Sequence, residues 1–75
     1  MRIKYDKKND AVYIRFSEKP CFQSDEIKED FILDFDKEGK IIGLEILDVS
    51  ENLPKEALSK ISFETQKQKT IKIVA

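Results

Sequence analysis

Two apolar segments joined by a short polar turn constrain the fold of this chain most strongly. Residues 31–35 and 41–47 are rich in β-branched and aromatic side chains, which is typical of strands. The turn 36–39 begins with aspartate and ends with glycine, a common connection in antiparallel hairpins. The sequence therefore predicts an antiparallel hairpin whose second, more apolar strand lies in the centre of a sheet.

The register of this hairpin has two alternatives. A three-residue loop with a glycine bulge places Leu33 opposite Gly43, whereas a four-residue loop places Leu33 opposite Ile42. Only the second is expected to bring Asp34 and Glu45 to one face of the sheet. The turn residues favour the first register and the separation of polar from apolar faces favours the second, so the sequence leaves both open.

The N-terminal segment predicts another hairpin. Residues 2–5 alternate between polar and apolar, residues 6–10 form a polar turn, and residues 11–16 are typical of a strand. Alternation along the second strand assigns its side chains to two faces: Val12, Ile14 and Phe16 to one, and Ala11, Tyr13 and Arg15 to the other.

Residues 17–29 are less clearly patterned. Residues 17–22 are interpreted as a connection, because Pro20 lacks a backbone donor. Residues 23–29 are polar and have two interpretations. They form either a loop or an edge strand whose charges discourage edge-to-edge aggregation.

The segment 50–61 is predicted to hold one helix. Asn52 is the expected N-cap, and Pro54 lies in the first turn, where proline is tolerated. The apolar residues of this segment recur at helical spacing and form one stripe: Leu53, Ala57, Leu58 and Ile61. Residues 70–74 predict a last strand.

These elements predict a single α+β domain over residues 1–75, with a small antiparallel sheet of four to six strands and one helix packed on one face. A chain of 75 residues buries a modest core. Because the strands carry apolar groups on both faces, we expect the helix to cover one face and another subunit the other. The expected oligomer is a homodimer.

The overall charge limits the possible partners. Fourteen basic and fifteen acidic residues give a net charge of −1, which argues against a dedicated nucleic-acid binder. No apolar run approaches the roughly 18 residues of a membrane span. The N-terminal residues lack the apolar core of a signal peptide, so we expect a cytoplasmic protein without membrane contact.

The absence of histidine limits the possible chemistry. It removes serine–histidine and cysteine–histidine catalysis and most zinc sites. The single cysteine, Cys21, excludes an intramolecular disulfide and is interpreted as an inert thiol. No catalytic residue and no cofactor is predicted, and the composition favours a non-enzymatic protein.

Asp34, Glu45 and Asp48 are the candidate metal ligands. Asp34 and Glu45 lie within otherwise apolar strands, where a charge needs a partner. A hard cation such as Mg²⁺ or Ca²⁺ is one such partner. The alternatives are solvent exposure or ion pairs with nearby cations: Arg15, Lys40 or Lys4.

Tyr13 and Arg15 are the candidate partner-binding residues, because tyrosine and arginine are frequent at interface hot spots. The alternative for this pair is cross-strand packing with a salt bridge. The lysines 67, 69 and 72 are candidates for contacts with phosphates, or they form the solvated face of an edge strand.

Four further polar residues are interpreted as structural. Asp6 and Asp10 flank a turn, where short acidic side chains bond nearby backbone amides. Asp48 and Ser50 are expected to organise the turn between the last hairpin strand and the helix in the same way.

Two blocks of the sequence resemble a known family. The first has the form YDxxxDAxYIxxS from residue 5, and the second has the form ILDxDxxGxxxGxEILDxS over residues 32–50. Together they resemble the domain-of-unknown-function family numbered 2283, over about residues 1–53. The resemblance implies a shared fold and no established activity. Genes of that family often neighbour genes for small toxin-like proteins, which implies an antitoxin or partner-binding role.

Three functions follow from these observations. The first is a non-enzymatic protein-binding module, with a small protein as partner. The second is a carboxylate-based metal-binding protein or enzyme that uses Asp34, Glu45 and Asp48. The third is a weak nucleic-acid binder that uses the C-terminal lysines. The missing catalytic residues and the near-neutral charge favour the first.

Overall fold

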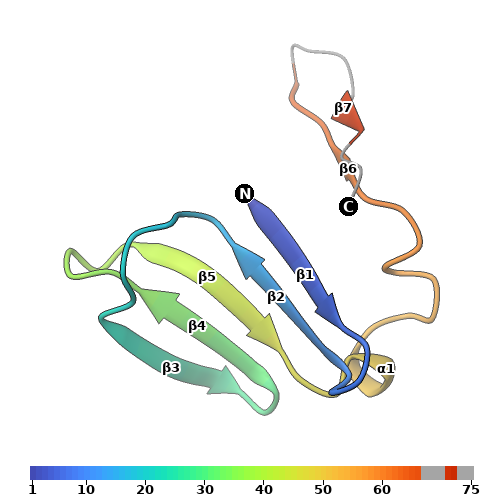
Figure 1. Ribbon diagram of the computed structural model, residues 1–75, viewed down its shortest axis with the longest axis horizontal. Coiled ribbons are helices and arrows are strands. Elements are labelled where there is room, and N and C mark those ends of the chain that lie inside the picture. Colours follow the sequence, from blue (N-terminus) through green and yellow to red (C-terminus); the bar gives the residue numbers. More distant parts are fainter. Residues whose placement is uncertain (67–70, 73–75) are drawn as a thin grey trace.

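The computed structural model describes residues 1–66 and 71–72, and its main element is a five-stranded antiparallel sheet (Figure 1). The strands are β1 (Arg2–Asp6), β2 (Ala11–Arg15), β3 (Gln23–Lys28), β4 (Phe31–Phe35) and β5 (Ile41–Ile46). Their spatial order is β1-β2-β5-β4-β3. Both predicted hairpins are confirmed, and β5 lies in the centre as predicted. The open question about residues 23–29 is answered by β3, an edge strand.

The turn between β4 and β5 is built around Asp36. Its backbone N–H donates to the carbonyl oxygen of Lys40 at 2.9 Å, as the shorter-loop alternative predicts. Its buried carboxylate accepts from the backbone N–H groups of Glu38 and Lys40, both at 2.9 Å. Gly39 has a φ of 81°, which glycine adopts without steric cost.

Hydrogen bonds from the backbone N–H groups of Lys40 and Glu38 hold the pKa of Asp36 below its ordinary value of 3.8. A lowered folded-state pKa gives stability that is present above the unfolded value and lost as the pH falls through the folded value. We therefore expect the urea midpoint to fall on acidification from about pH 6 to about pH 2. Asp36→Asn should flatten this dependence, and an unchanged slope would contradict this role of the Asp36 carboxylate.

Beyond the turn, a β-bulge changes the register of the β4–β5 pair. Ile42 is left unpaired, and Asp34 lies opposite Gly43. Leu33 therefore lies opposite Leu44, so both predicted partners of Leu33 are wrong. Neither alternative included the extra residue of the bulge. Because of that residue, the hairpin has the shorter loop, and Asp34 and Glu45 still lie on one face, as the longer loop predicted.

The register gives the sheet one apolar and one polar face. The apolar face carries Ile3, Tyr5, Val12, Ile14, Phe31, Leu33, Leu44 and Ile46. Val12 and Ile46 form a buried cluster with Val49, and Leu53 and Leu58 pack against it. The best-buried side chain is the bulge residue Ile42, at 1% exposed. The other face holds the charged residues of the central strands and is the subject of the next subsection.

The predicted helix is much shorter than expected. α1 covers only Val49–Asn52, and Asn52 lies at its end, so its prediction as N-cap is wrong. Proline disfavours helical backbone in the residue before it, and Leu53 before Pro54 is accordingly extended, with φ −116° and ψ 152°. No helix in the described residues is long and apolar enough to span a membrane.

The start of α1 is joined to the β1–β2 turn by Asp10. The backbone N–H of Val49 donates to the Asp10 carbonyl oxygen at 2.9 Å, and Ser50 Oγ donates to the Asp10 carboxylate at 2.6 Å. Asp6 binds within its own turn, because its carboxylate accepts from the backbone N–H of Asn9 at 3.1 Å. Asp10 was expected to bond a nearby amide and instead joins segments 40 residues apart.

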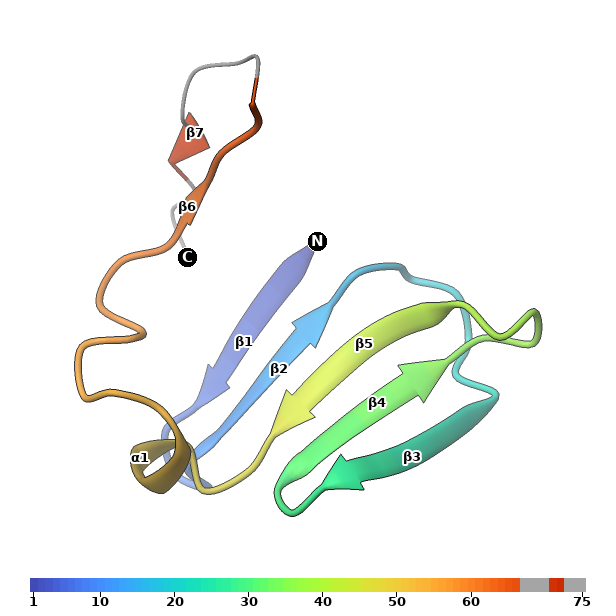
Figure 2. The ribbon, with the colours of Figure 1, turned by 180° about the vertical axis from the view of Figure 1, so that it is seen from behind.

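A second, two-stranded sheet follows the helix. It consists of β6 (Ser62–Phe63) and β7 (Ile71–Lys72), and it stands apart from the five-stranded sheet in Figures 1 and 2. The predicted strand 70–74 is described only at residues 71–72. The candidate lysines 67 and 69 lie outside the described residues, and the side chain of Lys72 is not described.

Candidate functional site

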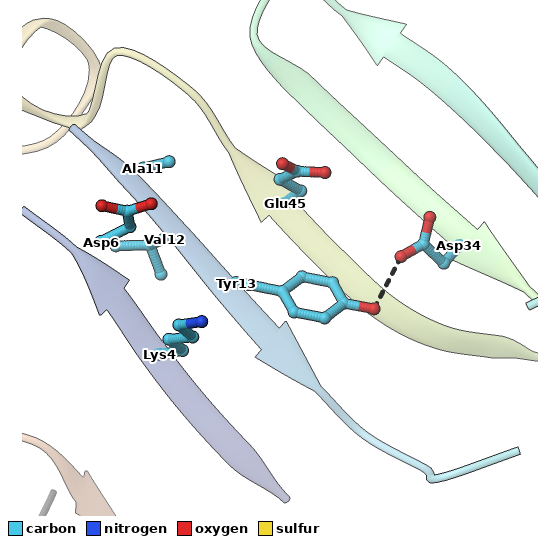
Figure 3. A pocket seen from close by; sticks show the side chains of 7 residues that line it. All are labelled: Lys4, Asp6, Ala11, Val12, Tyr13, Asp34 and Glu45. Atoms are coloured by element: carbon cyan, nitrogen blue, oxygen red, sulfur yellow. Dashed lines mark hydrogen bonds between the residues drawn. The ribbon is translucent and has the colours of Figure 1, made fainter. Parts of the chain in front are cut away.

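The polar face of the sheet contains a hollow of about 350 Å³ above β1, β2, β5 and β4. Figure 3 shows the side chains around it. They are Lys4, Asp6, Ala11, Val12, Tyr13, Asp34 and Glu45. Asp34 and Glu45 share this face because the bulge at Ile42 places Gly43 opposite Asp34.

A chain of hydrogen bonds fixes the side of the hollow near Asp34. The Tyr13 ring reaches across β5, and its hydroxyl donates to Asp34 Oδ2 at 2.8 Å (Figure 3). Ser24 on β3 donates to Asp34 Oδ1 at 2.5 Å. Arg15 Nη1 donates to the Tyr13 hydroxyl at 3.1 Å, and Arg15 Nη2 donates to the carbonyl oxygen of Lys19 at 2.8 Å. Asp34, 8% exposed, therefore has a protein donor on each carboxylate oxygen.

Gly43 makes room for the Tyr13 side chain. A Cβ atom at Gly43 would lie 2.9 Å from the Tyr13 hydroxyl oxygen, 3.1 Å from its Cε1 and 3.2 Å from Asp34 Oδ2. A glycine in a strand often marks a place where a neighbouring group approaches closely. Here that group is the tyrosine side chain, which explains a residue that otherwise weakens a central strand.

The pKa of Tyr13 is raised above its ordinary value of 10.0, mainly by burial and further by the hydrogen bond to Asp34. The Arg15 guanidinium opposes this shift. The hydroxyl therefore keeps its proton at neutral pH and acts as a donor toward Asp34. A tyrosine in this state does not serve as a general base.

Glu45 lies beside Tyr13 on the same face. It is half-buried, with Tyr13 opposite on β2 and Ile32 opposite on β4. Arg15, one of its expected partners, is turned toward Tyr13 and Lys19, and its Nε lies 3.7 Å from Glu18. In the part of the chain that the structure describes, no side chain forms an ion pair with Glu45.

The family described as Protein of unknown function (DUF2283) matches residues 2–50. The chain belongs to this family. The resemblance seen in the sequence is thereby confirmed. No curated protein and no solved structure matches the chain.

The DUF2283 match covers the residues that build the polar face. It spans β1 to β5 and ends at Ser50, whose hydroxyl donates to Asp10. Tyr13, Asp34 and Gly43 all lie within it. The segment after residue 50, in which the helix prediction failed, lies outside the match.

The three candidate metal ligands do not meet in this DUF2283 chain. Asp34 and Glu45 line one hollow, whereas Asp48 lies at the start of α1 and does not line it. Among residues 1–66 and 71–72, no group of three or more histidine, cysteine or acidic side chains is placed to hold a metal ion. Asp6, which the sequence pattern indicates only as a turn residue, also lines the hollow.

Cys21 lies in the connection before β3 and does not line the hollow. Its Sγ is 3.4 Å from Ser24 Oγ and 3.5 Å from the carbonyl oxygen of Gln23. The nearby Lys19 forms ion pairs at 3.8 Å and 3.7 Å with Asp36 and Glu38. The Lys19 ammonium group is therefore paired with two carboxylates of the β4–β5 turn.

Proposed function

We propose that this DUF2283 protein is a cytoplasmic, non-enzymatic protein-binding module whose polar sheet face contacts a small protein partner. The observation that supports this most is the fixed position of Tyr13. Its side chain packs on Gly43 and is held by Asp34 and Arg15. A tyrosine held in one conformation loses little side-chain entropy on binding, which favours affinity.

The chemistry of the hollow also supports binding over catalysis. Both oxygens of Asp34 already accept hydrogen bonds, one from Tyr13 and one from Ser24, so this carboxylate is committed to the protein's own groups. What remains in the hollow for a partner is the aromatic ring of Tyr13 and the half-buried carboxylate of Glu45. Buried tyrosine and arginine side chains are the usual anchors of protein interfaces.

The identity of the partner is proposed from the family resemblance. The frequent neighbourhood of DUF2283 genes with genes for small toxin-like proteins favours a small toxin, which this chain would neutralise by direct contact. The net charge of −1 and the mixed charges around the hollow are compatible with a protein surface.

The test is affinity capture of the tagged full chain from its native host, compared with Tyr13→Ala. We expect one small protein in stoichiometric amount with the wild type and at least about tenfold less with Tyr13→Ala, as for a hot-spot residue. Phe22→Ala is the matched control, because Phe22 is an exposed aromatic residue outside the hollow. Recovery of the wild type alone, or equal recovery with Tyr13→Ala, would contradict the proposal.

A further inference from the structure

We infer that the apolar face of the five-stranded sheet packs against the same face of a second copy of this chain. The two sheets would form a two-layer sandwich with the polar faces outward. This inference concerns the face opposite the hollow and does not depend on the proposed function.

The first argument is that the apolar face is covered only in part. Val12 and Ile46 are buried beneath Val49 at the end of the sheet where α1 lies. The other apolar side chains of the face remain half-buried, except Tyr5, which lies beside Val12 and is 46% exposed. The half-buried ones include Ile14, Phe31, Leu33 and Leu44. A stable domain normally buries such a face against a second layer.

The second argument is the distribution of charge. The register places no charged side chain of β1, β2, β4 or β5 on the apolar face. The polar face carries both signs of charge, and stacking it on itself would desolvate them. At the outer edge of the apolar face, β3 contributes Asp25 and Lys28, so an apolar centre has a polar rim. This is the usual composition of a protein interface.

The third argument is the available area. Five strands at about 4.8 Å spacing and about 18 Å length present a flat area of about 430 Å². Two such faces present about 860 Å² before the relief of the side chains is counted, and α1 with the segment after it already covers part of each face. A groove beside β1, lined by Tyr5, Leu53, Leu58 and Lys55 among others, borders the face. The contact therefore lies near the lower limit of about 1,000 Å² for a specific interface.

A second copy fits this face better than an unrelated partner does. Two sheets pack face to face about 10 Å apart when their inner side chains are apolar and interdigitate. A two-fold contact requires only that one patch complement itself, and an uncharged sheet face meets this condition. In the described part of the chain, only the four residues of α1 and the segment after it cover the apolar face of the sheet.

The experiment is light scattering of the full chain at about 50 μM, where a specific dimer with micromolar or tighter affinity is populated. We expect twice the mass of one chain. Leu33→Lys should give the mass of one chain, because it places a charge on the apolar face beside Leu44 of the central strand. Ile32→Lys is the matched control on the same strand, and it should remain dimeric because Ile32 lies on the polar face.

Two results would overturn the inference: a monomeric wild type, or a dimer that Ile32→Lys disrupts and Leu33→Lys does not. Circular dichroism checks that each variant folds. If Leu33→Lys fails to fold, isotope-filtered NMR on a mixture of labelled and unlabelled wild type replaces it. Contacts between copies should then involve the side chains of Ile14 and Leu33, and contacts through Ala11 or Glu45 would contradict the proposed face.

Discussion

Replacing Ile42 by alanine is expected to lower the free energy of unfolding by about 2–5 kcal/mol. Ile42 is 1% exposed, so alanine at this position loses buried methyl groups and leaves a cavity. A domain of this size has a total stability of only about 4–11 kcal/mol. The loss would therefore be a large part of the total, and urea denaturation followed by circular dichroism measures it directly.

The adjacent residue provides the control for this prediction. Ile41 is 49% exposed, and Ile41→Ala should cost less than about 1 kcal/mol. The comparison also tests the bulge, because a register slip of one residue exchanges the faces of two neighbouring side chains. Equal losses for the two variants, or a larger loss for Ile41→Ala, would contradict the register described above.

Replacing Gly43 by alanine is expected to cost about 1–3 kcal/mol, the usual range for an added group in a filled space. The new methyl group would lie 2.9 Å from the Tyr13 hydroxyl oxygen and 3.2 Å from Asp34 Oδ2. Either the Tyr13 ring or the strand must move, and the hydrogen bond from Tyr13 to Asp34 would lengthen. We expect the same variant to weaken partner binding in the capture experiment.

A double-mutant cycle separates the contact with Tyr13 from the backbone preference of glycine. In a Tyr13→Ala background the nearest atoms to the new methyl group are removed, so Gly43→Ala should cost much less than in the wild type. Additive losses in the double variant would show that Gly43 is required for another reason.

The strands follow from local patterns in the sequence. Alternation along residues 11–16 assigns Val12 and Tyr13 to opposite faces, and the register confirms this. The turn with Asp36 and Gly39 predicts the β4–β5 hairpin, because both residues satisfy requirements of the turn itself. Local chemistry of this kind is visible in a single sequence.

The features that were missed depend on competing or distant interactions. The helical stripe after residue 52 gave way to the restriction that Pro54 places on Leu53. Leu53 and Leu58 nevertheless pack against the apolar cluster, so the pattern indicated burial correctly and the secondary structure wrongly. The bond between Asp10 and Ser50 spans 40 residues, and no local pattern predicts it.

The sequence predicted the residues of the candidate site but not how their side chains contact one another. Tyr13, Arg15, Asp34 and Glu45 were all candidates, but the bond from Tyr13 to Asp34 requires β5 to lie between β2 and β4. Ser24 was missed because it belongs to the polar segment with two interpretations. Its position opposite Asp34 follows only from the pairing of β3 with β4.

The central place of β5 determines the order in which the chain can fold. The β1–β2 and β3–β4 hairpins each form from neighbouring residues, but they share no strand until β5 pairs with both β2 and β4. The β2–β5 pairing closes a long loop, which is slow compared with the closure of a hairpin. During synthesis, a nascent chain that ends before residue 41 contains two separate hairpins, and the sheet becomes one cooperative unit only once β5 has left the ribosome.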